Sequence, residues 1–229
     1  LGGHSLKLMK MTTMIYEKFH CDIPISKLLK HADIKWISQY ILMNQESQFE
    51  HIKPSEKKQF YEMSATQKRM YISYKIDQTG TAYNTPMLLS IKGKIEEEDL
   101  KEAVKKVVKR HEILRTIFVE NENTMMQKVL DDMDIDFNSQ VVPDDIETNI
   151  QNYIKPFDLE KGPLFRIRLF RVNQEKSYLF IDMHHIITDL VSIKLFMEEV
   201  AKFYNGVSLP EVKKQYRDFS EWQNERISS

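Results

Sequence analysis

Two adjacent histidines and a nearby aspartate, His184, His185 and Asp189, are the first candidates for chemistry in this chain. They stand in the stretch FIDMHHIITDLV, Phe180 to Val191. A neutral imidazole can accept a proton from an attacking nucleophile near pH 7. The aspartate can orient the turn or pair with a cation, because a buried carboxylate without a partner is costly. The stretch suggests an acid–base centre, with a pair of ordinary core or surface histidines as the alternative.

The pattern around the histidines predicts how they are positioned. The residues SYLFIDMHH indicate a buried strand, on which His184 and His185 point to opposite faces. One ring can then face a cavity while the protein holds the other. The same alternation makes shared metal ligation with Asp189 awkward, so we expect no metal site. The strand leads through IITDL into a helix beginning near Val191, which places free N–H donors beside the reactive group.

The second part of the chain alternates between helix and strand patterns. Helices are predicted at 64–76, 96–112, 144–154, 191–206 and 216–227. Strands are predicted at 84–94, 114–120, 124–130, 164–172 and 177–185. This alternation favours an α/β (α+β) fold class, a mixed sheet covered by helices.

The first part of the chain has an all-helical pattern. Apolar residues follow a helical period from Ser5 onward, and two shorter helices are expected around Ile25–Leu29 and Ile34–Leu42. Asp33 is the expected cap of the last helix. Residues 45–62 are polar and charged, which is a linker composition.

Composition is that of an ordinary globular protein. The chain has 229 residues, of which 41% are hydrophobic and 29% charged, with a net charge of −1. Without a basic excess, neither nucleic acid nor an anionic membrane is an expected partner. The single cysteine excludes an intrachain disulfide and a cysteine-based zinc cluster. With no apolar run near the roughly 18 residues of a membrane span and no signal-peptide core, we expect a cytoplasmic protein.

Several segments together resemble one known family. MHHIITDL resembles the HHxxxDG motif of nonribosomal peptide synthetase condensation domains, members of the chloramphenicol-acetyltransferase-like superfamily. Three further signatures have counterparts here, in the expected order: SATQKRMY, RHEILRTIF and YRDFSEW. YNTP at 83–86 and PFDLEKGPLFR at 156–166 also look typical. Four ordered signatures make the resemblance specific and favour the acid–base interpretation of the histidines.

The front of the chain carries a second resemblance. LGGHSLK resembles the attachment motif of peptidyl carrier domains, whose serine receives 4′-phosphopantetheine, and Ser5 would be that serine. The two resemblances imply a partial helical-bundle carrier domain at 1–44, a linker at 45–62 and the N-terminal lobe of a condensation domain at 63–229. Both domains are expected to be incomplete, so that the chain resembles a fragment of a longer synthetase.

The resemblance implies acyl transfer between carrier-bound thioesters, the step that joins amino acids in peptide antibiotic biosynthesis. The amine of a downstream aminoacyl thioester attacks the carbonyl of an upstream donor thioester. By motif position, His185 is the catalytic histidine, which deprotonates or positions the amine. His184 supports the loop, and Asp189 is the structural aspartate that pairs with Arg115.

The same resemblance implies the partners. They are the upstream and downstream carrier domains with their own phosphopantetheine arms, an adenylation domain and the missing C-terminal lobe of the condensation domain. A phosphopantetheinyl transferase would load Ser5.

Leu190 departs from the family pattern, which has glycine at this position. Glycine permits a positive φ, which would cost leucine about 1–2 kcal/mol. Three interpretations follow: a tolerated variant with an ordinary backbone, a narrowed tunnel with altered substrate choice, or a domain that has lost catalysis. The last would leave a docking module for carriers or tailoring enzymes. An epimerization domain, which shares the HHxxxD core, is a further alternative, although YNTP looks more like condensation.

Overall fold

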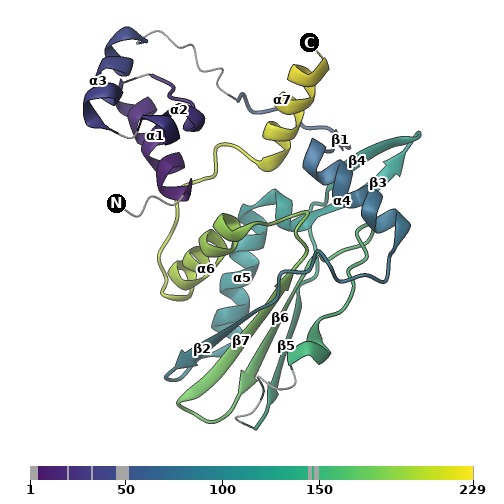
Figure 1. Ribbon diagram of the computed structural model, residues 1–229. Helices are drawn as coiled ribbons and strands as arrows, with labels where there is room; N and C mark the ends of the chain where they lie inside the picture. The colour runs from purple at the N-terminus through teal and green to yellow at the C-terminus, as the bar shows by residue number, and fades with distance from the viewer. Residues whose placement is uncertain are drawn as a thin grey trace. The chain divides into compact units, whose positions relative to one another are not determined.

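The chain forms two compact units, Leu1–His51 and Ile52–Ser229, in a computed structural model (Figure 1). The structure describes residues 5–19, 21–31, 33–44, 52–143, 146 and 150–228.

The first unit is a small helical bundle. Its helices are α1 (Ser5–Phe19), α2 (Ile25–Lys30) and α3 (Ile34–Met43). The Asp33 carboxylate accepts a hydrogen bond from the Trp36 N–H at 2.7 Å, so the predicted cap is confirmed. The buried core of this unit consists of Cys21, Ile23, Leu28 and Ile41. All three predicted helices are present.

The second unit contains the mixed elements that the sequence predicts. Its helices are α4 (Ala65–Ile76), α5 (Glu97–Arg110), α6 (Leu190–Tyr204) and α7 (Tyr216–Ser228), with short 3-10 turns η1 (Glu112–Arg115) and η3 (Ile150–Tyr153). Its strands are β1 (Tyr61–Glu62), β2 (Met87–Lys92), β3 (Thr116–Asn121), β4 (Thr124–Val129), β5 (Asp136–Val141), β6 (Phe165–Arg171) and β7 (Lys176–Met183).

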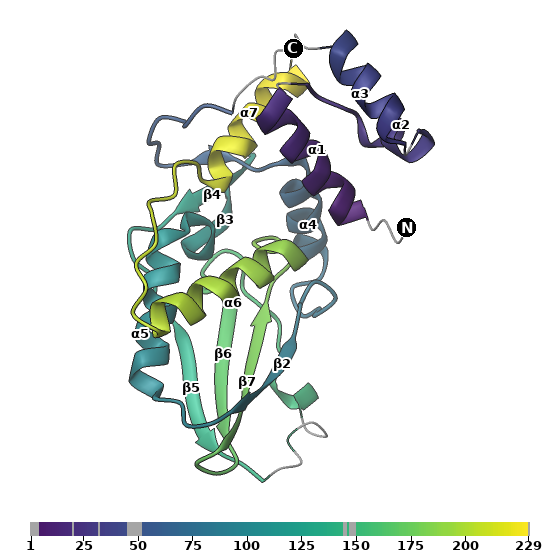
Figure 2. The same ribbon diagram turned by 90° about the vertical axis from the view of Figure 1, so that its left-hand side faces the viewer.

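These strands form two sheets. The larger has the order β2-β7-β6-β5, antiparallel except for the parallel pair β5–β6, and the smaller has the order β1-β4-β3. Helices α5 and α6 cover one face of the larger sheet (Figure 2). The expected mixed sheet covered by helices is therefore present, and so is the predicted hairpin of β3 and β4.

Strand β7 lies between β2 and β6 and is buried on both faces, which explains its nearly continuous apolar run. Leu179, Ile181 and Met183 belong to the main core beneath the two covering helices. Tyr178 and Phe180 belong to a smaller cluster on the opposite face. The alternation expected along this strand is thus present up to its C-terminal end.

Helix α5 follows from its sequence. Acidic residues occupy its first turn and Lys109 and Arg110 its last, which suits the helix dipole. Its apolar residues recur every three or four positions and are buried against the sheet: Leu100, Ala103, Val104, Val107 and Val108.

Two strands and one turn differ from the sequence prediction. Strand β1 lies inside the segment predicted as a linker, where Tyr61 is buried among charged neighbours. Strand β5 is a polar edge strand without apolar alternation, so no strand was predicted there. Of the helix predicted at 144–154, the structure describes only part, including the 3-10 turn η3.

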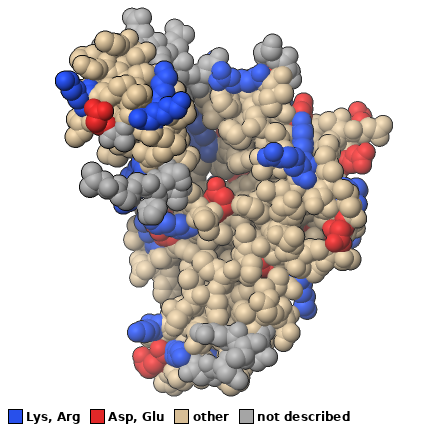
Figure 3. Space-filling view, viewed as in Figure 1, with Lys and Arg blue, Asp and Glu red and all other residues tan. Residues whose placement is uncertain are grey.

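Charges on the surface are mixed. On the face in Figure 3, the basic and acidic side chains that the structure describes lie in small separate groups. Within the described ranges, no helix has the length and apolar character needed to cross a bilayer.

Candidate active site

The histidine pair lies directly after strand β7, where the chain turns toward helix α6. The His184 N–H donates to the Leu164 carbonyl at 2.9 Å, and the His185 N–H donates to the Tyr83 carbonyl at 2.7 Å. The side chain of His184 is buried, whereas that of His185 is exposed. The structure therefore gives adjacent histidines opposite environments, as strand alternation predicts.

His184 is held inside the protein. Its ring lies against Tyr83 and Phe157, with centroid distances of 5.9 and 6.2 Å. Its Nδ1 accepts a hydrogen bond from the Ile186 N–H at 3.1 Å. Burial, followed by the neighbouring His185, lowers the pKa of His184 to about 4. The ring is therefore neutral near pH 7, with its proton on Nε2.

His185 is arranged to accept a proton. Its Nδ1 lies 2.5 Å from the Thr188 carbonyl oxygen. A carbonyl oxygen can only accept, so Nδ1 must carry the proton of the neutral ring. In this tautomer of the neutral ring, Nε2 carries the lone pair and can accept a proton. The loop that follows the strand thus selects the tautomer that a general base requires.

Asp189 is the N-cap of helix α6. Its Oδ1 accepts hydrogen bonds from the N–H and the hydroxyl of Ser192, both at 2.7 Å. Burial raises the pKa of Asp189, but the Ser192 hydrogen bonds, together with the Val191 N–H and the His185 ring, outweigh burial and leave the pKa below its usual value. The carboxylate therefore fixes the start of α6 directly after the histidine loop.

Leu190 occupies an ordinary helical position. It is the first residue of α6, and its side chain is 81% exposed. Among the non-glycine residues that the structure describes, positive φ angles occur at Glu122 and Asn123 alone. Leu190 consequently carries no left-handed strain, which agrees with a tolerated variant that has an ordinary backbone.

The expected ion pair between Arg115 and Asp189 is absent from the structure. Both side chains are described, and no contact joins them. The Arg115 guanidinium donates to the Leu130 carbonyl, and its Nη2 lies 3.9 Å from Glu112. Asp189 instead satisfies its carboxylate with the near neighbour Ser192.

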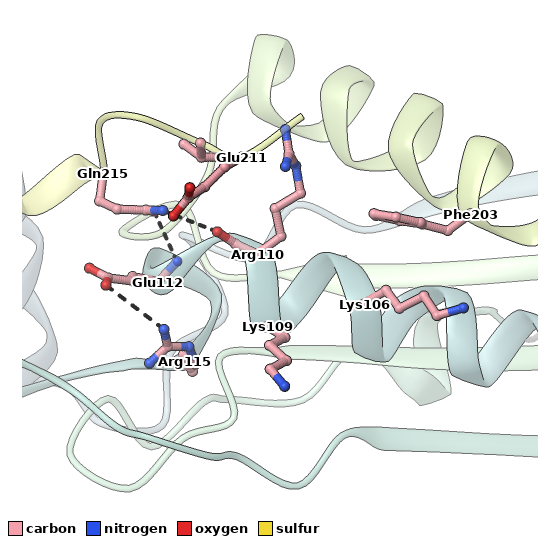
Figure 4. A pocket seen from close by; sticks show the side chains of 9 residues that line it. Lys106, Lys109, Arg110, Glu112, Arg115, Phe203, Glu211 and Gln215 are labelled. Carbon is pink, nitrogen blue, oxygen red and sulfur yellow. Dashed lines mark hydrogen bonds and ion pairs between the residues drawn. The ribbon is translucent and has the colours of Figure 1, made fainter. Parts of the chain in front are cut away.

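Arg115 lines a hollow of about 410 Å³ on the helical side of this unit (Figure 4). Its walls come from the end of α5, from Phe203 of α6 and from the segment 211–215. The Gln215 side chain accepts from the Glu112 N–H at 3.1 Å and donates to the Arg110 carbonyl at 3.1 Å. Arg115 therefore belongs to a corner that joins the chain's last segment to α5.

A buried polar cluster beneath the histidines was missed by the sequence analysis. Asp182 is fully buried, and its Oδ2 accepts from Asn84 Nδ2 at 2.7 Å and from Arg166 Nη1 at 3.2 Å. Burial raises the pKa of Asp182 to about 6, against the opposing effects of Asn84 and Arg166. The guanidinium of Arg166 also lies over the Phe157 ring, 3.8 Å from its centroid.

The signal for this cluster was an aspartate in an otherwise apolar strand. A charged residue at a buried position requires partners, which are distant in sequence. Asn84 and Arg166 stand in YNTP and PFDLEKGPLFR, segments noted only as typical of the family.

Two further candidates concern bound groups. Among the residues described, no three histidine, cysteine, aspartate or glutamate side chains come together to hold a metal ion. Ser5 is the first residue of α1, and its side chain lies outside the part of the chain that the structure describes.

Two protein-family models match this chain. The family model for the condensation domain matches residues 57–229. The chain belongs to the condensation domain family. Ahead of this region, the model for the phosphopantetheine attachment site matches residues 1–41, which is consistent with 4′-phosphopantetheine as the cofactor. Together the two matches indicate a carrier and condensation region of the nonribosomal peptide synthetase type.

Curated relatives that match the whole of this chain are large synthetases. Tyrocidine synthase 3 of Brevibacillus parabrevis is 38% identical over all of this chain, which covers 4% of that protein. Gramicidin S synthase 2 of Brevibacillus brevis is 36% identical over all of this chain, which covers 5% of that protein. The chain thus spans about one twentieth of the length of these relatives.

Solved structures show the same fold. The starter condensation domain of the rhizomide synthetase RzmA has a TM-score of 0.67 at 21% identity, covering 75% of this chain and 45% of that one. The X-domain in its complex with OxyB from teicoplanin biosynthesis has a TM-score of 0.71 at 21% identity, covering 78% of this chain and 41% of that one. The predicted chloramphenicol-acetyltransferase-like fold class is confirmed.

Proposed function

We propose that this chain is part of a nonribosomal peptide synthetase and forms an amide bond between a carrier-bound donor thioester and an aminoacyl acceptor. The observation that supports this proposal is the hydrogen bond of the His185 ring to the Thr188 carbonyl. The Nδ1 of this ring is committed to the Thr188 carbonyl, which leaves Nε2 unprotonated at the exposed end of a buried strand.

His185 Nε2 acts in the step in which the acceptor amine attacks. The acceptor amine attacks the donor carbonyl, a C–N bond forms, and the C–S bond breaks, so that the donor arm leaves as a thiolate and takes up a proton. His185 Nε2 accepts a proton from the attacking nitrogen or holds the amine in line. The growing chain then remains on the downstream phosphopantetheine arm.

The neighbouring residues have supporting roles in this proposal. His184 is neutral and packs the loop from inside. Asp189 fixes the start of α6, and Arg115 supports the corner near η1. Neither of these last two needs to touch the substrate.

The domain arrangement is also part of the proposal. Residues 1–44 are the rear of a carrier domain, 45–62 a linker and 63–229 the N-terminal lobe of a condensation domain. The family matches at 1–41 and 57–229 support this order, and the 41–45% coverage of solved neighbours supports a single lobe. The partners are the second lobe, an adenylation domain and the flanking carriers, all in a cytoplasmic synthetase.

A transfer assay tests the proposed reaction. In the complete synthetase with both carriers loaded, the downstream arm is analysed by mass spectrometry over time. Wild type is expected to accumulate dipeptidyl product, and His185→Ala to do so about 10²–10⁴-fold more slowly, the usual contribution of a general base. Background transfer in both proteins would contradict the proposal.

A docking module is the second candidate. The observation that favours it is the likeness to the X-domain, a protein solved in complex with OxyB, combined with the Leu190 departure. Such a module would bind carriers or a tailoring enzyme equally well with His185 or with alanine at this position, without any transfer.

Loading of Ser5 is tested separately. After incubation with coenzyme A and a phosphopantetheinyl transferase, the intact protein is expected to gain the mass of one phosphopantetheine. Ser5→Ala should gain none. An equal mass gain in that variant would place the attachment site elsewhere.

A further inference from the structure

One short segment, residues 83–85, holds the backbone that leads into His185. The His185 N–H donates to the Tyr83 carbonyl at 2.7 Å. The N–H and the hydroxyl of Thr85 donate to the Met183 carbonyl at 2.8 and 2.6 Å. Between them, Asn84 forms a β-bridge with His184. The segment 83–85 therefore sets the register of the strand end that carries His185.

Asn84 ties this segment to the protein interior. Its Nδ2 donates to Asp182 Oδ2 at 2.7 Å and to the Lys155 carbonyl at 2.9 Å. Asp182 is fully buried, and Arg166, its second donor, also donates to the Lys155 carbonyl at 2.7 Å. A single side-chain amide thus joins three segments: 83–85, strand β7 and the segment 155–156.

Within the described residues, the Asn84 amide shares the Asp182 carboxylate with Arg166 and with the backbone of Thr85. Asp182 Oδ1 and Asn84 Oδ1 are both buried and have no hydrogen-bond partner there. A buried carboxylate that loses a donor is left under-solvated, so the surrounding backbone shifts or water enters. Removal of the Asn84 amide would loosen the segment that aligns His185.

We propose that Asn84 is a positioning residue for the condensation reaction, acting through Asp182 to hold the His185 backbone in register. It touches neither the donor thioester nor the acceptor amine. This inference rests on the proposed function, because it concerns the alignment of His185 Nε2 with the attacking nitrogen. Misplacement of a catalytic group by about 1 Å can cost on the order of 10²-fold in rate.

The kinetic test uses Asn84→Ala in the complete synthetase, with the acceptor carrier supplied in trans. We expect kcat for dipeptidyl transfer to fall about 10- to 100-fold while KM for the carrier changes little. The matched control is Asn173→Ala, an exposed asparagine at the opposite end of β7, which should keep the wild-type kcat. A wild-type kcat in Asn84→Ala would overturn the inference.

Hydrogen–deuterium exchange of the same proteins tests positioning without turnover. Peptides covering 83–85 and 183–185 should exchange about tenfold faster in Asn84→Ala, because the His185 and Thr85 amides lose their fixed partners. Peptides at the hairpin end of β7 should be unchanged. Unchanged exchange at 83–85 and 183–185 would contradict the inference, whatever the rate of transfer.

A double variant of Asn84 and Asp182 distinguishes loss of positioning from misfolding. Asn84→Asp combined with Asp182→Asn exchanges the two groups and keeps an amide–carboxylate hydrogen bond between them. We expect the double variant to recover kcat and slow exchange relative to either single variant. A double variant that refolds without recovering kcat would overturn the inference. His185→Ala, assayed in parallel, reports on the proposed function itself, because only failure of that function leaves wild type and His185→Ala equal.

Discussion

The two ends of strand β7 are held in different ways. At the hairpin end, the Val172 N–H donates to the Lys176 carbonyl at 3.0 Å and the Glu175 N–H to Asn173 Oδ1 at 2.9 Å, all within one short stretch of the chain. At the histidine end, Asn84 reaches Asp182 across 98 residues of sequence, inside the protein.

This difference separates what forms the strand from what aligns the site. Local hydrogen bonds are sufficient to turn a hairpin, and they tolerate substitution at an exposed position. The histidine end depends on buried polar groups, which specify one arrangement only if each has its partner. In this one strand, residues at the hairpin end can be replaced, whereas the histidine end depends on particular buried contacts.

The largest difference in stability is expected between variants of two arginines in strand β6, Arg166 and Arg168. Arg166 pairs with Asp182, and the two side chains are 8% and 0% exposed. Arg168 pairs with Asp136 at 2.8 Å, where the side chains are 21% and 43% exposed. Arg166→Met should lower the free energy of unfolding by about 3–5 kcal/mol, because it leaves a buried carboxylate unpaired. Arg168→Met should lower it by about 1 kcal/mol or less.

Chemical denaturation of both variants checks this prediction. Equal losses would mean that the buried pair at the histidine end is no more important than the exposed pair.

The pH dependence of stability should reveal two opposing buried groups. Burial raises the pKa of Asp182 to about 6, so the folded chain binds a proton more readily there and stability falls as pH rises from about 4 to 6. Burial lowers the pKa of His184 to about 4, so the unfolded chain binds the proton more readily and stability rises over nearly the same interval.

Asp182→Asn removes the first effect and leaves the second. Between pH 4 and 6, its free energy of unfolding should rise by about 2–3 kcal/mol relative to that of wild type, as the shift in the pKa of Asp182 implies. The measurement is a series of denaturation curves at fixed pH. Parallel curves for the two proteins would contradict the buried environment of Asp182.

Replacing Asp189 should lower the free energy of unfolding by less than the loss of a buried ion pair with Arg115 would. The structure makes it a helix cap, so Asp189→Ala should lower the free energy of unfolding by about 1 kcal/mol. Asp189→Ser retains a cap and should lie within about 0.5 kcal/mol of wild type. A loss of several kcal/mol in both variants would instead restore the ion-pair interpretation.

Leu190→Gly should have the smallest effect. Leu190 begins a helix and is exposed, so glycine should lower the free energy of unfolding by about 1 kcal/mol at most. The rate of dipeptidyl transfer should stay within about threefold of wild type, a factor equal to less than 1 kcal/mol in the barrier. A large increase in rate or in the range of accepted substrates would favour the narrowed tunnel.

Local patterns were sufficient to predict the elements that position the site. Periodicity predicted α5 and α6, and the buried apolar run predicted β7, directly after which the two histidines lie in opposite environments. The pattern failed for β1 and β5, because a short strand among charges and a polar edge strand have no apolar alternation.

Contacts around the site were less predictable. The resemblance suggested that Asp189 pairs with Arg115, but a serine three positions ahead satisfies the carboxylate without closing a long loop. The cluster of Asn84, Asp182 and Arg166 joins parts of the chain that only the fold brings together.

We propose that His185 carries the chemistry while its buried surroundings hold it in place. The most direct test measures, in the complete synthetase, both dipeptidyl transfer and the unfolding of the condensation region for His185→Ala. We expect a rate about 10²–10⁴-fold below wild type with unfolding unchanged, because the exposed ring contributes to reaction rather than to the core. Transfer at the wild-type rate, or a loss of rate that only follows a loss of stability, would contradict it.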